Sequence, residues 1–128
     1  MKTEKALAPI IHSFLTDHLN CQRGLSLNTI KSYRDVIRQM LVFAAKVLKK
    51  PCTQLTVEQI DVAPVLRYLS YLEKDLGNSA QTRNHRLAVI RSLFEYVGSR
   101  DLVLIDHCRK ITSIPFKRTK PPLTRYLE

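Results

Sequence analysis

The chain lacks any apolar run long enough to cross a membrane. Its longest such run, Met40 to Ala45, covers six residues, whereas a membrane-spanning helix needs about 20. The first fifteen residues also lack the continuous apolar segment of a secretory signal, because Pro9, His12 and Ser13 interrupt it. The sequence therefore predicts a cytoplasmic protein with no membrane partner.

Cysteine is scarce and widely spaced. Cys21, Cys52 and Cys108 lie at least 31 positions apart, so the chain has no C-x-x-C pair of the kind that binds zinc. An isolated free cysteine usually behaves as a small apolar side chain. We therefore expect three reduced, mostly buried thiols and no metal site.

Motifs for catalysis are also missing. The chain has no P-loop, no glycine-rich phosphate cradle, no H-E-x-x-H and no nucleophile elbow. Its four histidines have no carboxylate and nucleophile at a recognisable spacing. They are His12, His18, His85 and His107. The chain taken alone is predicted not to be an enzyme and to need no cofactor.

Glycine is rare, and its positions are informative. Gly24, Gly77 and Gly98 each fall where an apolar helical pattern stops. No alternating pattern typical of a strand competes with these helices. At 128 residues the chain has the size of one domain. The sequence therefore predicts an all-α domain, a bundle of four to five helices.

The helix boundaries follow from capping signals. A first helix carries its apolar face over residues 7–19, and a second, long helix starts at Ser26 and must end before Pro51. A third opens at Thr56 with Gln59 placed to complete a capping box, and it bends or restarts near Pro64. The last long helix runs from Ser79 to Gly98, and a short closing helix lies within residues 101–111.

Positive charge is the strongest compositional signal. The chain has 21 Lys and Arg against 11 Asp and Glu, a net charge of +10. Each cation that neutralises a phosphate releases a condensed counterion, so this balance favours a nucleic-acid partner. An anionic membrane surface would attract the same charge.

Part of this charge lies in a stretch without a core of its own. Residues 109–125 contain six Lys or Arg, no acidic residue and three prolines. Such a segment is typical of an extended basic linker. The sequence thus predicts a helical domain over residues 1–112, followed by a basic, proline-containing segment over residues 113–128.

Two helices begin with side chains suited to DNA. Lys31, Arg34 and Arg38 form a basic stripe on the second helix, whose first turns also hold Asn28, Thr29 and Ser32. The last long helix opens with a polar run, Gln81 to Arg86. A helix fits the major groove, where Arg, Asn and Gln make bidentate contacts with base edges, and its N-terminal amides favour phosphate. A lone helical histidine such as His85 is interpreted as a surface or groove residue.

These two helices resemble the signature helices of the N-terminal core-binding domain of tyrosine recombinases, the phage integrase and Xer-like family. The matching segments read Ser26-Leu-Asn-Thr-Ile-Lys-Ser-Tyr-Arg and Thr82-Arg-Asn-His-Arg-Leu-Ala-Val-Ile-Arg-Ser-Leu-Phe-Glu-Tyr, about fifty residues apart. The closing Pro122-Leu-Thr-Arg-Tyr-Leu-Glu is similar to the entry into that family's catalytic domain. The resemblance extends from about Ala6 to Glu128.

The resemblance implies a SAM-like helical bundle that forms one half of a clamp around double-stranded DNA. Two helices would lie in the major groove, and the basic linker would follow the duplex to the other half. The side chains assigned to DNA on this basis are Asn28, Thr29, Lys31, Ser32, Arg34, Arg38, Gln81, Thr82, Arg83, Asn84, Arg86, Arg91, Lys117, Arg118 and Lys120.

The resemblance also implies what the rest of such a protein does. In the family, a tyrosine cleaves the strand through a covalent 3′-phosphotyrosyl intermediate, with arginines and a histidine stabilising the transition state. These residues would lie beyond Glu128, because no H-x-x-R occurs here. The family often has Asn-Pro after the last long helix, whereas this chain has Ile105-Asp106-His107. The isolated domain would be monomeric, and the parent, from a bacterium or phage and acting at the nucleoid, a tetramer on DNA.

Two other functions fit the same charge pattern. One is a helical protein-interaction bundle whose basic face meets an acidic partner. The other is a free-standing helix-turn-helix regulator, which needs two short helices joined by a tight turn. The segment before Ser79 is long enough to be a bundle helix, which makes the regulator the weaker of the two.

Overall fold

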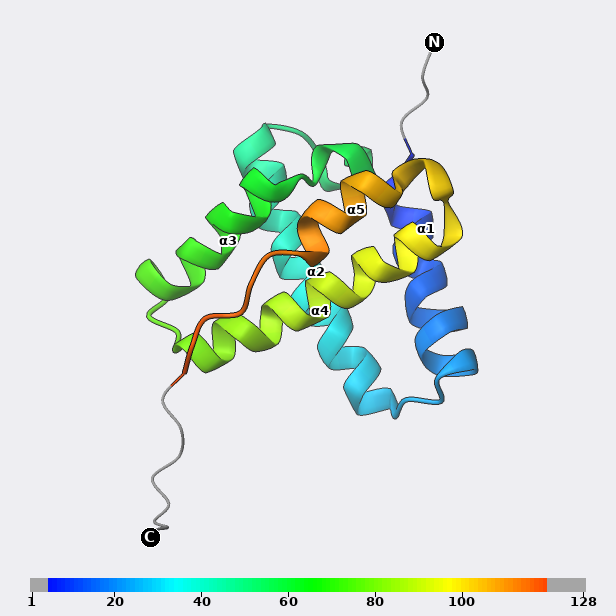
Figure 1. Cartoon of the computed structure of the whole chain (residues 1–128), viewed down its shortest axis with the longest axis horizontal. Helices are drawn as coiled ribbons and strands as arrows, with labels where there is room; N and C mark the ends of the chain where they lie inside the picture. Colours follow the sequence, from blue (N-terminus) through cyan, green and yellow to red (C-terminus); the bar gives the residue numbers. More distant parts are fainter. Residues whose placement is uncertain (1–4, 120–128) are drawn as a thin grey trace, which may run out of the picture.

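The computed structural model describes residues 5–119, and every secondary-structure element named in this range is a helix. The longest helices are α2 (Leu27–Leu48) and α4 (Ala80–Arg100), with α3 (Val62–Lys74) between them in sequence. Two shorter helices, α1 (Leu7–Ser13) and α5 (Ile105–Thr112), complete the set of five α-helices in this range (Figure 1). The predicted all-α class, a bundle of four to five helices, is confirmed.

The first helix differs from the single α-helix expected over residues 7–19. From Phe14 to Gln22 the backbone widens into a π-helix that continues α1. Phe14 and Leu19, five positions apart, are both completely buried. A π-helical turn places residues five apart on one face, so the wider turn accounts for the burial of both side chains.

The predicted caps of α2 and α4 are present. Ser26 Oγ accepts a hydrogen bond from the Thr29 amide at 3.2 Å, and Ser79 Oγ accepts one from the Thr82 amide at 3.1 Å. Helix α2 ends at Leu48, and its C-cap residue Lys49 has a φ of 57°, in the left-handed region. Pro51 follows in an extended conformation, and without a backbone N–H it could not continue the helix.

The capping box at Thr56 and Gln59 forms, but on a single 3-10 turn, Val57–Gln59. Helix α3 then begins anew behind Asp61, whose side chain accepts from the Val62 amide at 2.7 Å. Pro64 is the third residue of α3, a first-turn position where its missing N–H costs nothing. The predicted restart near Pro64 is confirmed.

The expected end of the last long helix at Gly98 is wrong. Helix α4 runs through Gly98 and ends at Arg100. A Cβ added at Gly98 would lie 3.3 Å from Cβ of Cys108 on α5. The glycine therefore permits close packing of α5 on α4. Gly24 and Gly77, with φ of 64° and 70°, do end helical segments.

The thiols also differ from expectation. Cys108 is buried between α4 and α5, but Cys21 and Cys52 are exposed. Cys21 lies near the end of the π-helix, and Cys52 in the 3-10 turn that follows Pro51. Phe14 and Leu19 are the residues of the π-helix that face the core, and the 3-10 turn has no buried residue, so both thiols are left exposed.

Helix α4 is the central element of the bundle, in contact with α2, α3 and α5 (Figure 1). Leu87, Ile90, Leu93 and Phe94 of this helix are completely buried. Beyond α5 the chain turns back and runs beside α4 (Figure 1). Within residues 5–119, none of the helices combines the length and the apolar character that crossing a membrane requires.

Candidate nucleic-acid interface

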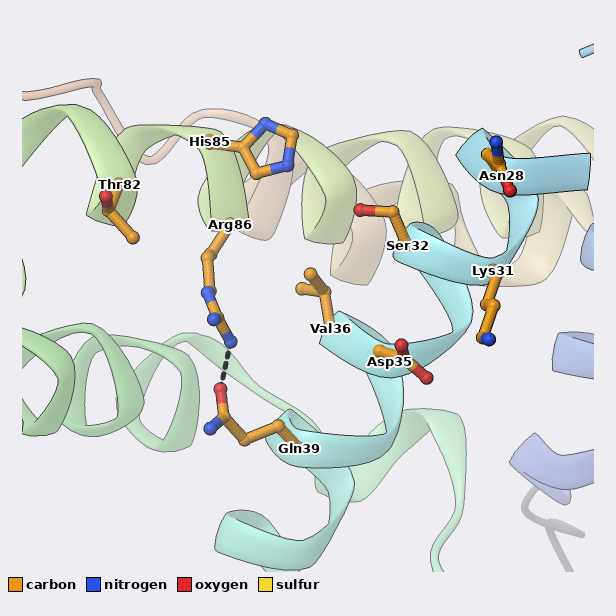
Figure 2. Close-up of a pocket in the computed structure, with 9 residues that line it drawn as sticks. All are labelled: Asn28, Lys31, Ser32, Asp35, Val36, Gln39, Thr82, His85 and Arg86. Carbon is orange, nitrogen blue, oxygen red and sulfur yellow. Dashed lines mark hydrogen bonds between the residues drawn. The ribbon is translucent and has the colours of Figure 1, made fainter. Parts of the chain in front are cut away.

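A groove of about 470 Å³ separates the first half of α2 from the first turns of α4. Eight of its nine lining residues are polar or charged, and the only apolar one is Val36 (Figure 2). The lining residues are Asn28, Lys31, Ser32, Asp35, Val36, Gln39, Thr82, His85 and Arg86.

A hydrogen-bonded network forms the inner end of this groove. The Tyr68 hydroxyl donates to Oε1 of Gln39 at 2.6 Å, and Arg86 donates to the same oxygen. Figure 2 shows Arg86 of α4 reaching across to Gln39 of α2. Arg86 Nη1 also lies 3.3 Å from the Tyr68 oxygen. Burial raises the pKa of Tyr68, and the neighbouring Arg86 partly offsets that shift.

Arg86 has an unusual electrostatic environment. The side chain is half-buried, and within residues 5–119 no carboxylate lies within 4 Å of its guanidinium. Its partners are neutral oxygens of Gln39 and Tyr68. The positive charge of Arg86 is thus oriented by the network without being neutralised, which suits the binding of an anion.

The α2 side of the groove contains three of the sequence-predicted residues. Asn28, Lys31 and Ser32 line it and are exposed. Thr29 does not line the groove, and its hydroxyl accepts from Ser26 Oγ at 3.0 Å in the helix cap. Asp35 brings one negative charge to the groove, and Arg34 Nε lies 3.7 Å from it.

The basic stripe predicted on α2 is divided between two surfaces. Lys31 faces the groove, whereas Arg34 and Arg38 border a separate hollow of about 220 Å³ together with Ile11 and Cys52. An α-helix has 3.6 residues per turn, so side chains at i, i+3 and i+7 do not all point in the same direction. The sector of the helix surface that they cover is wide enough to reach both hollows. All three cations are exposed.

The α4 residues are divided in the same way. Thr82, His85 and Arg86 face the groove, and Gln81 is exposed outside it. The structure corrects the expected position of Arg83, which is only 7% exposed and lies 3.8 Å from Glu73.

Two further α4 residues contact the segment after α5 instead of the groove. Asn84 forms hydrogen bonds with Lys117, and Arg91 packs over Phe116.

The linker residues occupy different environments. Lys117 Nζ is 2.8 Å from Glu73 Oε1, and Arg118 is exposed. Lys120 and the predicted entry into a second domain lie outside the described residues. The segment 113–119 packs against the domain in part, unlike the extended basic linker that the sequence predicts, because Ile114 is only 5% exposed. The predicted domain boundary at residue 112 coincides with the end of α5 and stays a prediction.

Gln39, Asp35 and Tyr68 were not recognised from the sequence as parts of the site. A signal for two of them exists, because Asn28, Ser32, Asp35 and Gln39 follow one another at steps of four, three and four. This spacing places polar side chains on one face of α2, next to the buried face. Tyr68 gave no such signal, because it is completely buried and lies on another helix.

Comparisons with known proteins place the chain in a family. Residues 11–101 match the family model described as "Phage integrase, N-terminal SAM-like domain". The chain therefore belongs to the phage integrase family of helical N-terminal domains. No solved structure gives a match.

Relatives agree with this assignment. The chain is 35% identical over 127 residues to "Putative integrase/recombinase y4rD" of Sinorhizobium fredii, covering 99% of the chain and 45% of that protein. It is 37% identical to y4rC of the same organism over 127 residues, 99% of the chain and 38% of that protein. "Tyrosine recombinase XerC" of Thermodesulfovibrio yellowstonii is 29% identical over 112 residues, 87% of the chain and 33% of that protein. The chain thus spans less than half the length of these relatives.

Proposed function

We propose that this chain binds double-stranded DNA through the groove between α2 and α4, as the N-terminal half of the DNA clamp of a site-specific tyrosine recombinase. The observation that carries the proposal is that Lys31 and Arg86 both line this groove, and that Arg86 is oriented by Gln39 and Tyr68 but has no carboxylate partner in residues 5–119. A net charge of +10 supports it.

The groove suits a duplex in two ways. Lys31, Ser32 and Thr82 supply the ammonium and hydroxyl groups that position phosphates. Asn28 and Arg86 carry the amide and guanidinium groups that read adenine or guanine edges. Phosphate contacts give affinity without sequence preference, whereas base contacts give specificity, so the two sets make separable contributions.

The same proposal covers the whole protein. Relatives named integrase, recombinase and tyrosine recombinase support a role in DNA integration and recombination. The chain matches less than half of each, so we assign tyrosine-mediated strand cleavage to the remainder of such a protein. In this scheme the isolated domain is a monomer, and the parent assembles as a tetramer on DNA in the cytoplasm.

A duplex titration across a salt series tests the proposal. Lys31→Ala is expected to weaken duplex binding about three- to tenfold near 100 mM salt and to lower the slope of log K against log salt by about 0.9. Arg86→Gln should also weaken binding, and Arg86→Lys should restore part of it, since Lys keeps the charge but not the planar fork. Thermal unfolding of each variant verifies the fold.

Arg100→Gln is the matched control. Arg100 is exposed on the last turn of α4, roughly 20 Å from Arg86 along the helix axis. It removes one charge, as Lys31→Ala does, so equal losses in the two variants would contradict a binding site at the groove. Absence of duplex binding by the wild-type chain at low salt would instead favour an acidic protein partner.

A further inference from the structure

The segment after α5 is attached to α3 and α4 by four side chains, which we call the clasp: Glu73, Arg83, Asn84 and Arg91. We infer that the clasp residues are positioning residues, which fix the path of residues 113–119 and thereby the direction in which the following chain meets DNA. The inference rests on the proposed function, because it assumes a duplex in the groove between α2 and α4.

Asn84 makes the most specific contact in the clasp. Its Oδ1 accepts from the Lys117 amide at 2.8 Å, and its Nδ2 donates to the Lys117 carbonyl at 2.7 Å. One side-chain amide thus satisfies both backbone polar groups of a residue 33 positions away. This pairing fixes the backbone of Lys117 whatever its side chain does.

Glu73 connects α3 to the same place. Its Oε1 lies 2.8 Å from Lys117 Nζ and 3.8 Å from Arg83 Nε. Arg83 Nη1 in turn donates to the Pro115 carbonyl at 3.4 Å and to Asn84 Oδ1 at 3.1 Å. Arg83 is buried, and its Nε has no hydrogen-bond partner in the described residues, so the carboxylate of Glu73 is its nearest compensation.

Arg91 holds the segment about two turns further along α4. Its guanidinium carbon lies 4.7 Å from the centre of the Phe116 ring, and its Nη1 donates to the Ile114 carbonyl at 3.4 Å. Ile114 is buried beside it. Cation–π contact and apolar burial thus add to the polar contacts at Asn84.

The order of these contacts gives the segment a direction. Ile114 meets Arg91, and Lys117 meets Asn84, so the chain runs antiparallel to α4, towards its N-terminal end (Figure 1). That end also presents Thr82 and Arg86 to the groove. One flank of α4 therefore faces the proposed DNA site, and the other directs the chain that follows. This division explains why α4 begins with so many polar side chains.

Amide hydrogen exchange in the 128-residue chain tests whether the clasp forms. Asn84→Ala should accelerate exchange of the Lys117 amide about tenfold, because its acceptor is lost. Asn84→Asp keeps the acceptor but loses the donor, so it should give an intermediate rate. Gln81→Ala, an exposed amide on the same helix, is the matched control and should leave Lys117 unchanged. Equal exchange in wild type and Asn84→Ala would overturn the clasp.

A DNA-cleavage assay tests the positioning role. In a background with Cys21→Ser and Cys52→Ser, which removes the two exposed thiols, an iron chelate attached at Thr119→Cys cuts nearby DNA strands. We expect cuts within a narrow window of base pairs, and we expect Asn84→Ala to broaden that window while duplex affinity changes less than twofold. An unchanged window, or a loss of affinity as large as that of Lys31→Ala, would overturn the positioning role.

The two arms separate the two claims. If no variant or wild-type chain binds duplex, the proposed function fails and the positioning role fails with it, while the exchange rates still show whether the clasp forms. If duplex binds through the groove but Lys117 exchanges freely, the proposed function stands and the clasp is overturned.

Discussion

Gln39 Oε1 accepts a hydrogen bond from the Tyr68 hydroxyl at 2.6 Å and another from Arg86, so one amide oxygen of α2 connects α3 and α4. The Tyr68 ring is completely buried beneath this contact. A buried hydroxyl needs a partner, and Gln39 supplies it while keeping its oxygen turned towards Arg86. The network thus connects the stability of the bundle to the orientation of the groove's arginine.

Replacing Tyr68 by Phe should separate these two effects. The variant keeps the ring and loses only the hydroxyl, so we expect the free energy of unfolding to fall by about 1 kcal/mol in urea denaturation. Duplex affinity should fall less than in Arg86→Gln, because Gln39 still accepts from Arg86. Tyr33→Phe is the control, since the Tyr33 hydroxyl makes no hydrogen bond within residues 5–119. A larger loss of stability in the control would contradict the role given to Tyr68.

Cys108 should make stability depend on pH in the alkaline range. Burial, with a smaller contribution from Asp101, raises the pKa of the Cys108 thiol from 9.0 to about 11. Between these values the unfolded chain has released the thiol proton and the native chain has kept it. The unfolded state then binds fewer protons, so the free energy of unfolding falls as pH rises from 9 to 11.

The measurement is urea denaturation at several pH values in that range. Two pKa units correspond to a decline of about 2–3 kcal/mol from this group. Between pH 9 and 11 the free energy of unfolding of Cys108→Ala should decline by that amount less than the free energy of unfolding of wild type. The variant is nevertheless less stable than wild type at pH 7. Cys52→Ala removes an exposed thiol and should follow the wild-type curve. Parallel curves for wild type and Cys108→Ala would show that the thiol does not retain its proton in the fold.

A branched side chain at Gly98, in the last turn of α4, should destabilise the fold. A Cβ there would already approach Cys108 Cβ to 3.3 Å, so Gly98→Val must push α5 away from α4. We expect a loss of about 1–3 kcal/mol in the free energy of unfolding. Ser99→Val places the same side chain on the exposed neighbouring position, where helix propensity changes and one hydrogen bond, from the Ser99 hydroxyl to the Tyr96 carbonyl, is lost. A Gly98→Val protein as stable as Ser99→Val would contradict close packing of α5.

Local rules account for the part of this fold that the sequence predicts well. Ser26 and Ser79 cap helices where their side chains can reach the next free amides, and Pro64 lies in a first turn. Each of these signals acts within four residues. The helix end predicted at Gly98 is wrong, because glycine is needed there for close packing against Cys108, which lies ten positions away on another helix.

The candidate site was predictable only in part for the same reason. The sequence identified the polar opening of α4, and Thr82 and Arg86 do face the groove. Local pattern could not assign Arg83, Asn84 and Arg91 to the other flank, since their partners are 23 to 33 positions away in the segment after α5. Periodicity shows that a helix has two polar flanks, but not what covers either of them.

The Glu73–Arg83 pair should respond unequally to removal of its two partners. Glu73→Gln leaves the buried guanidinium of Arg83 without its carboxylate, and Lys117 then adds a second uncompensated charge nearby. We expect a loss of about 2 kcal/mol in the free energy of unfolding, less than for a fully buried pair because the Glu73 side chain is 23% exposed. Glu95→Gln, an exposed acid on α4, should cost almost nothing.

Arg83→Met is the complementary variant. Methionine fills much of the same space without a charge, and Glu73 keeps Lys117 Nζ at 2.8 Å, so the loss of stability should be smaller than for Glu73→Gln. Arg83 is 7% exposed and faces the clasp, so it makes no direct contact with a duplex in the groove. Apart from the small effect of losing one distant positive charge, duplex affinity should stay within about twofold of wild type. Denaturation and duplex titration on the same samples give both quantities. If Arg83→Met kept its stability but bound duplex as weakly as Lys31→Ala, Arg83 would have to leave the clasp and contact DNA.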